Sequence, residues 1–232
     1  MKMSHIEIPA EFNRNAPAVQ AAGAEKTGAV LIELACNLVG YPNLADKDVL
    51  DIGCGVRFTQ TIINRDIPIK SYTGIDIDEP LINYLTNNVQ DSRFSFYYWH
   101  IYNELYNLKG EKLSKSMRLP LSQNKQFDLI WMFSVITHNY PNDTESLLYI
   151  ARKYIKKNGF LFFSAFIDNN IDTFEDREKA EPLITAYYNE KYLKQIIQRA
   201  DWHVKSAHGK NPEKAIMNHF VCTPKYHFWE IF

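Results

Sequence analysis

The chain of 232 residues lacks the features that mark several large classes of protein. Its three cysteines, Cys36, Cys54 and Cys222, are odd in number and widely spaced, which indicates neither a disulfide framework nor a CxxC metal site. No apolar run approaches the length of a membrane span, and the first residues contain no apolar signal core. The formal net charge of −1 offers no footprint for a polyanion, which argues against nucleic acid as the main partner. These absences predict a soluble protein of the reducing cytoplasm with no membrane partner, and they leave its oligomeric state open.

Length and composition predict one α/β domain. Apolar residues make up 46% and charged residues 23% of the chain, which are ordinary globular values, and 232 residues are short for two domains. We expect a single domain over residues 1–232, with an arm or lid at 1–26, a core at 27–224 and a tail at 225–232. The arm is either a disordered leader or a segment that folds over a pocket. The aromatic tail packs on the domain, closes the pocket or meets a partner chain.

Two acid-ended apolar runs organise the sequence. The first, Val49–Ile52, contains Asp51 and runs into Gly53 and Gly55, as expected for a buried strand followed by a sharp turn. The second, Tyr72–Asp76, ends in an acid twenty-one residues after Gly55. A strand, a glycine turn, a helix and a second strand with a terminal acid make up a nucleoside-binding βαβ unit of a doubly wound sheet.

Periodicity places further elements along the chain. Strands are predicted at 47–52, 71–77, 93–99, 127–133, 160–167, 203–207 and 216–223. Helices are predicted from Glu25 to Gly40, around 58–63 and from Asn189 to Ala200. A further helix with Pro80 in its first turn is predicted from a cap at Asp78 or Glu79 to Val89. Another is predicted from a cap at Asn142 or Asp143 to Lys156, Lys157 and Gly159. Residues 103–126 are polar and predict a long connection of the kind that often serves as a functional lid.

With VLDIGCG at residues 49–55, the chain resembles class I S-adenosylmethionine-dependent methyltransferases over roughly residues 44–224. The acid two residues before the first glycine carries this resemblance. It implies an α/β fold with a doubly wound, mostly parallel seven-stranded sheet in the order 3-2-1-4-5-7-6, the last strand antiparallel and helices on both faces. It also implies the cofactor S-adenosyl-L-methionine and the product S-adenosyl-L-homocysteine.

The resemblance assigns roles to the residues around the glycine turn. Gly53 and Gly55 allow close approach of the methionine portion, because a Cβ there would block it. Asp51 helps to hold the ammonium group, and Asp76 accepts hydrogen bonds from both ribose hydroxyls. The predicted cofactor site as a whole comprises Asp51, Gly53, Cys54, Gly55, Asp76, Ile77, His100, Ile101 and Phe133, with Ile77 and Ile101 sandwiching the adenine.

Two positions depart from the family pattern. Arg57 stands where the family usually has a third glycine, so its side chain must point away from the cofactor or reshape the turn. The stretch His100–Gly110 resembles a subgroup pattern, D-I-Y-N-x-x-Y-N-P-x-G, and places His100 where an Asp often accepts from the adenine amino group. A neutral imidazole can accept one such hydrogen bond. The alternative is that His100 is an ordinary loop histidine.

The segment Phe133–Tyr140 follows the fourth predicted strand and resembles the subgroup's S-V-F-T-H segment. In such folds ligands bind at the carboxyl ends of the strands. His138 is therefore a candidate general base or substrate contact, with a packing role as the alternative. Tyr102, Tyr106 and Tyr140 are candidates for lining the acceptor pocket.

Missing motifs narrow the acceptor. The sequence has no N/D-P-P-Y/F tetrad, no Pro-Cys nucleophile and no acidic metal site after the fourth strand. We therefore expect a metal-independent enzyme that methylates oxygen or nitrogen of a small molecule, such as a specialised metabolite. Arg57 and His100 keep open a cofactor-binding but inactive or regulatory subunit, and an enzyme acting on protein or RNA also stays open. An NAD-dependent dehydrogenase is disfavoured because Phe58 stands where it needs glycine.

Overall fold

A computed structural model describes the chain except for residues 1, 15, 179, 210–216 and 227–232 and the side chain of Ala18. It contains two compact units, residues 1–99 and residues 100–232, and each is described by itself. No helix among the described residues has the length and apolar character needed to cross a membrane. The predicted division into arm, core and tail of a single domain stays a prediction.

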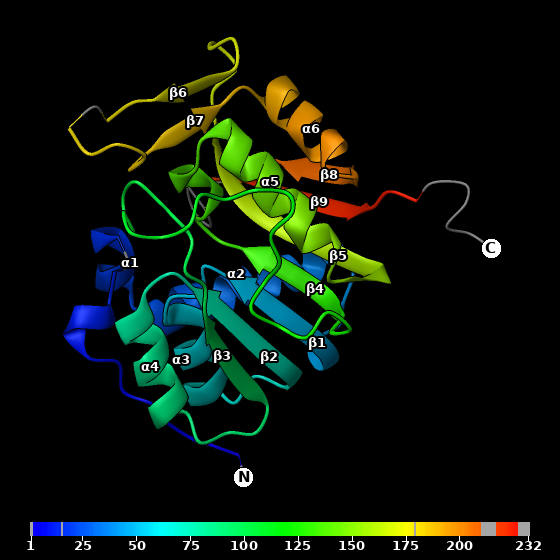
Figure 1. The fold of residues 1–232 in the computed structure, drawn as a ribbon. Coiled ribbons are helices and arrows are strands. Elements are labelled where there is room, and N and C mark those ends of the chain that lie inside the picture. Colours follow the sequence, from blue (N-terminus) through cyan, green and yellow to red (C-terminus); the bar gives the residue numbers. More distant parts are fainter. Residues whose placement is uncertain (1, 15, 179, 210–216, 227–232) are drawn as a thin grey trace. The chain divides into compact units, whose positions relative to one another are not determined.

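Three parallel strands form the sheet of the first unit (Figure 1): β1 (Leu44–Ile52), β2 (Ile69–Asp76) and β3 (Phe94–Tyr98). They lie in the order β3-β2-β1, as the first three positions of the predicted order require. The register sets Asp51 beside Gly74 and Asp76 beside Tyr98. The second halves of β1 and β2 are buried, as expected for parallel strands that helices cover on both faces.

The helices of this unit begin and end for local reasons. Helix α2 (Ala24–Val39) ends at Gly40, which adopts the left-handed conformation typical of a helix end. Helix α3 (Arg57–Asn64) follows the glycine turn. Helix α4 (Glu79–Asn88) begins after Asp78, whose side chain accepts a hydrogen bond from the Leu81 amide, as predicted for one of the two candidate caps.

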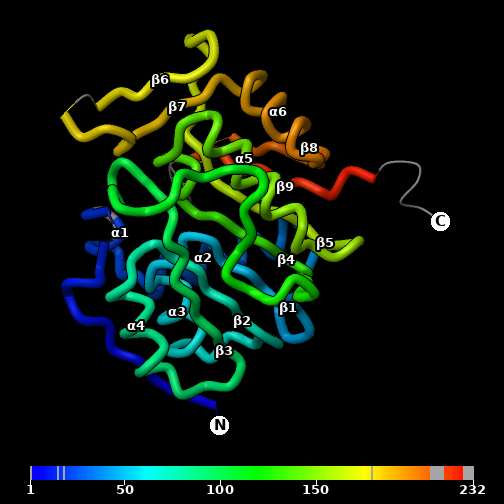
Figure 2. The backbone as a smooth tube through the Cα atoms, viewed as in Figure 1, coloured from blue at the N-terminus to red at the C-terminus, as the bar shows by residue number. Residues whose placement is uncertain are grey.

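The described part of the N-terminal arm lies beside α3 and α4 of its own unit (Figure 2). It contains a 3₁₀ turn, η1 (Ala10–Phe12), and a short helix, α1 (Pro17–Ala22), before α2. Ile6 is buried and exchanges two hydrogen bonds with the Asn64 side chain at the end of α3. The ring of Phe12 lies 5.0 Å from that of Tyr84 on α4. These contacts attach the described part of the arm to α3 and α4, and its role as a leader or as a lid stays a prediction.

The second unit has a mixed sheet. Strands β4 (Phe127–Met132) and β5 (Ile155–Ile167) are parallel, and the C-terminal strands β8 (Trp202–His208) and β9 (Asn218–Pro224) form an antiparallel hairpin whose β9 pairs antiparallel with β5. The predicted C-terminal hairpin is thereby confirmed, with its last strand beside the fifth. The predicted start of that strand at Ile216 lies outside the described residues.

Two short strands are absent from the prediction. Strands β6 (Phe174–Asp176) and β7 (Ala186–Tyr188) are antiparallel to each other, and β7 continues the sheet beside the end of β5. Seven strands were expected, whereas the described part of the chain has nine. Three-residue strands in a polar segment give too little periodicity to be detected from the sequence. The α/β class with a mostly parallel sheet is nevertheless as predicted.

The second unit contains one 3₁₀ turn and two α-helices among the described residues. A 3₁₀ turn, η2 (Ile136–His138), precedes helix α5 (Pro141–Arg152), and helix α6 (Glu190–Arg199) is capped by the Asn189 side chain. Between Trp99 and β4 the chain forms no helix and no strand longer than an isolated bridge, as the predicted connection at 103–126 requires.

The boundary between α5 and β5 differs from the prediction. The helix begins at Pro141, ahead of the expected caps Asn142 and Asp143, and ends at Arg152. Residues Lys156, Lys157 and Gly159, expected to close the helix, lie in β5 within a register shift opposite β4. Lys156 reaches Asp128 on β4 with an Nζ–Oδ2 distance of 2.7 Å, so the lysine that resembles a helix terminator anchors a bulge.

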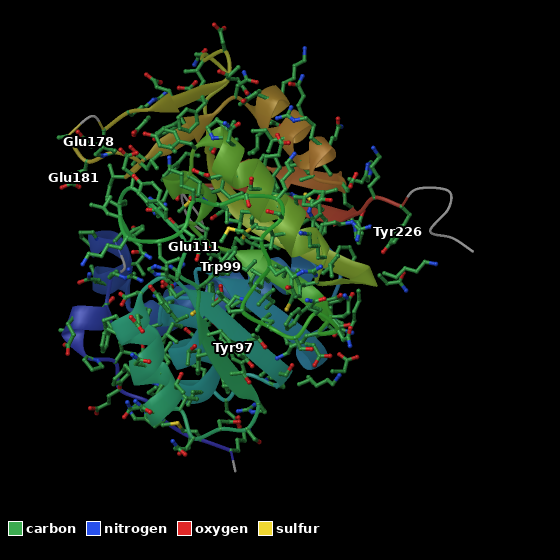
Figure 3. All side chains as sticks on the ribbon, viewed as in Figure 1. Tyr97, Trp99, Glu111, Glu178, Glu181 and Tyr226 are labelled. Carbon is green, nitrogen blue, oxygen red and sulfur yellow. The ribbon has the colours of Figure 1, made fainter. Side chains whose placement is uncertain are left out.

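The start of the tail is held at the edge of this unit. The Tyr226 hydroxyl donates to the Lys157 carbonyl, and its ring lies 5.2 Å from the Arg152 guanidinium (Figure 3). This contact agrees with the alternative that the tail packs on the domain as far as Tyr226. The rest of the tail lies outside the described residues.

Substitution of Gly28 by alanine tests the packing of α2 on α3. A Cβ at Gly28 would lie 2.1 Å from Oγ1 and 3.0 Å from Cβ of the buried Thr61. We expect Gly28→Ala to lower the free energy of unfolding by about 1–3 kcal/mol, because this overlap outweighs the gain of roughly 1 kcal/mol in helix propensity. Urea unfolding measures the change. Glu33→Ala on the exposed face of α2 is the control, and a Gly28→Ala variant as stable as the wild type would contradict this packing.

His219 on β9 predicts a pH dependence of stability. Its ring is buried and stacks on Phe162 at 5.4 Å, and burial together with the charge of His208 lowers its pKa to about 4. An unfolded histidine binds a proton below about pH 6.5, so between pH 6.5 and 4 the unfolded state binds more protons than the folded state. Stability should therefore fall as the pH drops through this window, by roughly 2–3 kcal/mol at most.

Urea unfolding at pH values from 4.5 to 7.5 measures this effect in the wild type and in His219→Gln. The variant should lose most of the slope, whereas His203→Gln, which removes an exposed histidine of β8, should retain it. An equal slope in wild type and His219→Gln would assign the pH dependence to other groups.

Candidate functional site

Asp51 lies at the end of β1 and is 1% exposed. Its Oδ2 accepts a 2.6 Å hydrogen bond from the Tyr72 hydroxyl on β2, and burial together with the Asp51 charge raises the pKa of Tyr72 well above its usual value. Arg57 also acts on Asp51: burial lowers the pKa of the guanidinium, and the Asp51 charge opposes that shift. The residue that departs from the glycine pattern thus supplies a positive charge to the buried carboxylate.

The glycine turn follows directly. The amides of Gly53 and Cys54 both donate to the Ile75 carbonyl, at 2.8 and 3.0 Å, which binds the turn to the end of β2. Gly53 and Gly55 have φ values of 71° and 48°, a region that residues with a Cβ adopt at a cost. A Cβ built on Gly55 would meet no atom within 4 Å, so space is open beside the turn. The turn therefore leaves room for a ligand to approach the backbone.

Asp76 ends β2 and is 5% exposed. Its Oδ2 accepts from the Gly55 amide at 2.9 Å, which ties the second acid to the turn of the first. Its Oδ1 accepts from the Asp78 amide at 3.1 Å and from Arg14 Nη2 at 3.3 Å, and Arg14 also pairs with Asp78. Since each carboxylate oxygen has two lone pairs, Asp76 can accept a further hydrogen bond.

Two predicted residues of the first unit have simpler settings. The Cys54 thiol is buried, and burial together with the charges of Asp76 and Asp51 raises its pKa, so it remains a neutral thiol that packs beneath the turn. Ile77 is half-buried and follows Asp76 at the end of β2. The structure therefore brings Asp51, Gly53, Cys54, Gly55 and Asp76 together at one edge of the β1–β2 pair.

In the second unit, the connection after Trp99 forms a compact loop. The Tyr102 amide donates to the Glu111 carbonyl and the Glu111 amide to the His100 carbonyl, while Asn107 Nδ2 donates to the Ile101 carbonyl. The His100 side chain is exposed, and Ile101 and Tyr102 are half-buried. The backbone of this loop is thus fixed by its own hydrogen bonds.

The segment after β4 is strained. Phe133 is buried among the rings of Trp131, Phe162 and His219. Ser134, the next residue, has φ of 59°, and its amide donates to Ser164 Oγ at 2.8 Å. A left-handed conformation in a residue with a Cβ costs on the order of 1–3 kcal/mol and is concentrated at functional sites.

The ring of His138 is oriented by a second strained residue. Its Nδ1 lies 2.8 Å from the carbonyl oxygen of Leu183, which has φ of 63°. A carbonyl can only accept, so Nδ1 carries the hydrogen and, in the neutral ring, Nε2 carries the lone pair. The ring edge of Tyr106 packs at 5.4 Å, and Asn103 Nδ2 donates to the His138 carbonyl at 2.8 Å.

Two acids influence the hydroxyl of Tyr140. The Glu104 carboxylate, as a hydrogen-bond acceptor, raises the pKa of the Tyr140 hydroxyl to about 12, and Asp176 adds to the shift. Asp176 Oδ2 accepts from the Leu183 amide at 2.9 Å. Leu183 thereby connects Asp176 to His138 through one peptide backbone. The second unit thus brings His138, Tyr106 and Tyr140 into one region.

Sequence reasoning missed several residues of these clusters, which are Arg14, Tyr72, Glu104, Ser134, Asp176 and Leu183. Tyr72 lies in the predicted strand next to that of Asp51, so the sequence could have suggested its hydrogen bond to Asp51. Leu183 had no signal, because its contribution comes from a backbone conformation. Glu104 and Asp176 are far apart in the sequence, and only the fold shows that both act on Tyr140.

Residues 19–207 match the family described as methyltransferase domain. Three solved structures show the same fold. A S-adenosylmethionine-dependent methyltransferase of Leishmania major is 15% identical with a TM-score of 0.61, covering 91% of this chain and 80% of that one. The glycopeptide N-methyltransferase MtfA with sinefungin is 11% identical with a TM-score of 0.60, covering 85% and 94%.

The third structure is a complex between the Trm112 methyltransferase activator of Haloferax volcanii and a methyltransferase. The matching chain of this complex is 11% identical with a TM-score of 0.60, and the match covers 90% of this chain and 95% of that one. The glycine turn, the two acids and the open space beside Gly55 fit a nucleoside cofactor that carries an amino acid group. With the family match extending over most of the residues, the chain belongs to the methyltransferase domain family and is an S-adenosylmethionine-dependent methyltransferase.

Proposed function

We propose that this enzyme methylates an oxygen or nitrogen atom of a small-molecule acceptor, such as a specialised metabolite, without a metal ion. The observation that carries the proposal is the pair of buried carboxylates, Asp51 and Asp76, joined through the glycine turn. The fold is shared with MtfA, a glycopeptide N-methyltransferase, so this fold accommodates a nitrogen acceptor.

The residues of the first unit have distinct tasks in this proposal. Asp51 faces the ammonium group of the cofactor, while its Oδ2 accepts from the Tyr72 hydroxyl and Arg57 supplies positive charge to it. Gly53 and Gly55 allow the backbone to approach the methionine portion, and Asp76 accepts from the ribose hydroxyls. Arg14 donates to Asp76 Oδ1, whereas Gly55 donates to Asp76 Oδ2. Because the ribose hydroxyls compete with Arg14 for Oδ1, the arm must move when the ribose binds.

The chemistry places few demands on the protein. S-adenosylmethionine, when bound, supplies a methyl group on a positively charged sulfur, and the acceptor's lone pair forms the new bond as the carbon–sulfur bond breaks with its electron pair left on sulfur. The chain orients the acceptor and takes up a proton where the acceptor has one to lose. His138 Nε2 is the proposed proton acceptor, and Tyr102, Tyr106 and Tyr140 line the acceptor pocket. The roles of His100, Ile101 and Phe133 toward adenine stay predictions from the resemblance.

A screen tests the proposal. The protein is incubated with S-adenosylmethionine and pools of small molecules that carry phenol, alcohol, carboxylate or amine groups, and release of S-adenosylhomocysteine is followed by mass spectrometry. We expect release in at least one pool, with the acceptor gaining one methyl group. Binding of S-adenosylhomocysteine without turnover in any pool, and turnover with a protein or RNA substrate instead, would overturn the small-molecule assignment.

Asp76→Ala should weaken binding of S-adenosylhomocysteine by about 1–3 kcal/mol, because charge-assisted hydrogen bonds to the ribose are lost. Isothermal titration calorimetry measures the affinity, and Asp76→Asn provides a variant of the same shape. The control is Asp46→Ala, which removes an exposed acid near the other end of β1. Wild-type affinity in both Asp76 variants, with melting temperatures near that of the wild type, would remove Asp76 from the cofactor site.

His138→Asn separates proton transfer from packing. The asparagine amide can keep the hydrogen bond to the Leu183 carbonyl, but it has no basic nitrogen in place of Nε2. We expect kcat with an acceptor found in the screen to fall by about 10²–10⁴ and the acidic limb of the pH–rate profile to disappear, with affinity for S-adenosylhomocysteine unchanged. His203→Asn is the control. A retained acidic limb would assign His138 a structural role.

A further inference from the structure

Side chains around Tyr140 combine exposed apolar surface with negative charge. Among the described residues, the large apolar side chains that remain exposed are Val30 on α2, at 38%, and Tyr106, Leu108 and Tyr140, at 44%, 69% and 39%. Three of these four lie in the loop after Trp99 or at the start of α5. Tyr106 packs on His138, two residues before Tyr140, so these two exposed rings lie in one region. Exposed apolar surface of this kind is typical of contact sites.

The loop and the start of α5 are joined by specific contacts. Asn103 Nδ2 donates to the His138 carbonyl and approaches Asn139 Oδ1 at 3.3 Å, and Asn103 Oδ1 accepts from the amides of Leu105 and Tyr106. Asn103 is buried at the centre of these bonds. The loop therefore holds Glu104 and Tyr106 in fixed positions beside the segment 138–140.

Aromatic rings surround the same place. Tyr106 packs edge-on against His138, and Tyr140 lies 5.8 Å from Phe174 on β6. Phe174 in turn contacts Tyr188 on β7 at 5.1 Å, and the Tyr188 hydroxyl donates to the Asn139 carbonyl. The β6–β7 pair thus supports the ring of Tyr140, whereas the ring of Tyr106 packs on His138.

Two carboxylates act on the Tyr140 hydroxyl from different elements, Glu104 from the loop and Asp176 from the end of β6. Asp176 Oδ1 is buried and accepts no hydrogen bond among the described residues, so it can still accept one. The sequence from 172 to 181 holds five acids and two bases. One of these bases, Arg177, pairs with Asp168 and Glu175.

We propose that the acceptor is a protonated amine, bound with its ammonium group between Glu104 and Asp176 and against the rings of Tyr140 and Tyr106. This inference rests on the proposed methyltransferase function and narrows its acceptor to nitrogen. An ammonium group gains from both carboxylates and from the negative faces of aromatic rings. A carboxylate or phosphate would be repelled. A neutral alcohol could donate one hydrogen bond to a carboxylate, but it lacks the positive charge that both carboxylates and the ring faces attract.

The same cluster provides for the proton that the amine must lose. An ammonium group has no lone pair, so one proton leaves before the nitrogen can form its bond to the methyl carbon. His138 Nε2 takes that proton and passes it to water, because Nδ1–H is held by the Leu183 carbonyl. Leu183 also donates its amide to Asp176, so the proton acceptor and the binding carboxylate are positioned by one residue.

Binding measurements test the proposal without turnover. The protein is first saturated with S-adenosylhomocysteine and then titrated with 2-phenylethylamine, 2-phenylethanol and 3-phenylpropionate, and with the matched set hexylamine, hexanol and hexanoate. We expect at least one amine to bind ten-fold or more tightly than its alcohol and its carboxylate. Glu104→Gln and Asp176→Asn should each reduce that preference ten-fold or more.

Glu178→Gln is the matched control, because Glu178 is an exposed acid in the connection between β6 and β7, as is Glu181 (Figure 3). It should leave the preference for the amine unchanged. Melting temperatures of all variants establish that they are folded.

Several outcomes would overturn the amine assignment. These are an alcohol or carboxylate that binds as tightly as the amine, a preference that survives in both Glu104→Gln and Asp176→Asn, and a panel in which no amine binds although S-adenosylhomocysteine does. Failure of S-adenosylhomocysteine to bind would instead refute the proposed function itself. Methyl transfer to oxygen of a bifunctional amino alcohol, detected by mass spectrometry, would also contradict the amine acceptor.

Discussion

The structure of the first unit depends on the burial of two carboxylates at the ends of adjacent parallel strands. Asp51 and Asp76 are 1% and 5% exposed, and an uncompensated buried charge costs several kcal/mol. Each acid therefore has its own set of donors. Asp51 receives the Tyr72 hydroxyl and the field of Arg57, and Asp76 receives the amides of Gly55 and Asp78 and the Arg14 guanidinium. The backbone amide of the first turn satisfies the acid of the second strand, so turn and strand are fixed together.

The backbone conformation at position 57 explains why the chain tolerates Arg57 where the family usually has glycine. The conformations that need glycine are those of Gly53 and Gly55, both with positive φ, whereas Arg57 is the first residue of α3. Its guanidinium lies 5.2 Å from the Phe58 ring and is influenced by Asp51. The third glycine is thus replaced at a helical position, where a side chain is permitted and a positive charge beside Asp51 is useful.

The sequence was most informative where local pattern and burial coincide. Local pattern predicted the buried runs of β1, β2 and β4 and the start of a helix at Asp78. It also predicted that two acids and the glycines between them lie at the ends of adjacent strands. Prediction failed where a local signal had a nonlocal cause. Lys156, Lys157 and Gly159 resemble a helix end, yet a Cβ on Gly159 would lie 2.9 Å from the Asp128 carbonyl oxygen, so this glycine is required by the neighbouring strand. Strands β6 and β7 are defined by their pairing with each other and with β5, which composition does not reveal.

In the second unit, His138, the proposed proton acceptor, is oriented by residues whose backbone is strained. Ser134 and Leu183 both adopt left-handed conformations, and both are held there by hydrogen bonds, Ser134 by Ser164 Oγ and Leu183 by Asp176. If Leu183 relaxed, its carbonyl would leave His138 Nδ1 and its amide would leave Asp176, so relaxation of one residue would cost two hydrogen bonds. The strain therefore persists because the surrounding contacts outweigh it. Asp176 also has two tasks. Its Oδ2 accepts from the Leu183 amide, and its charge acts on the Tyr140 hydroxyl. Its Oδ1 accepts no hydrogen bond among the described residues, so a positively charged acceptor would complete its set of donors.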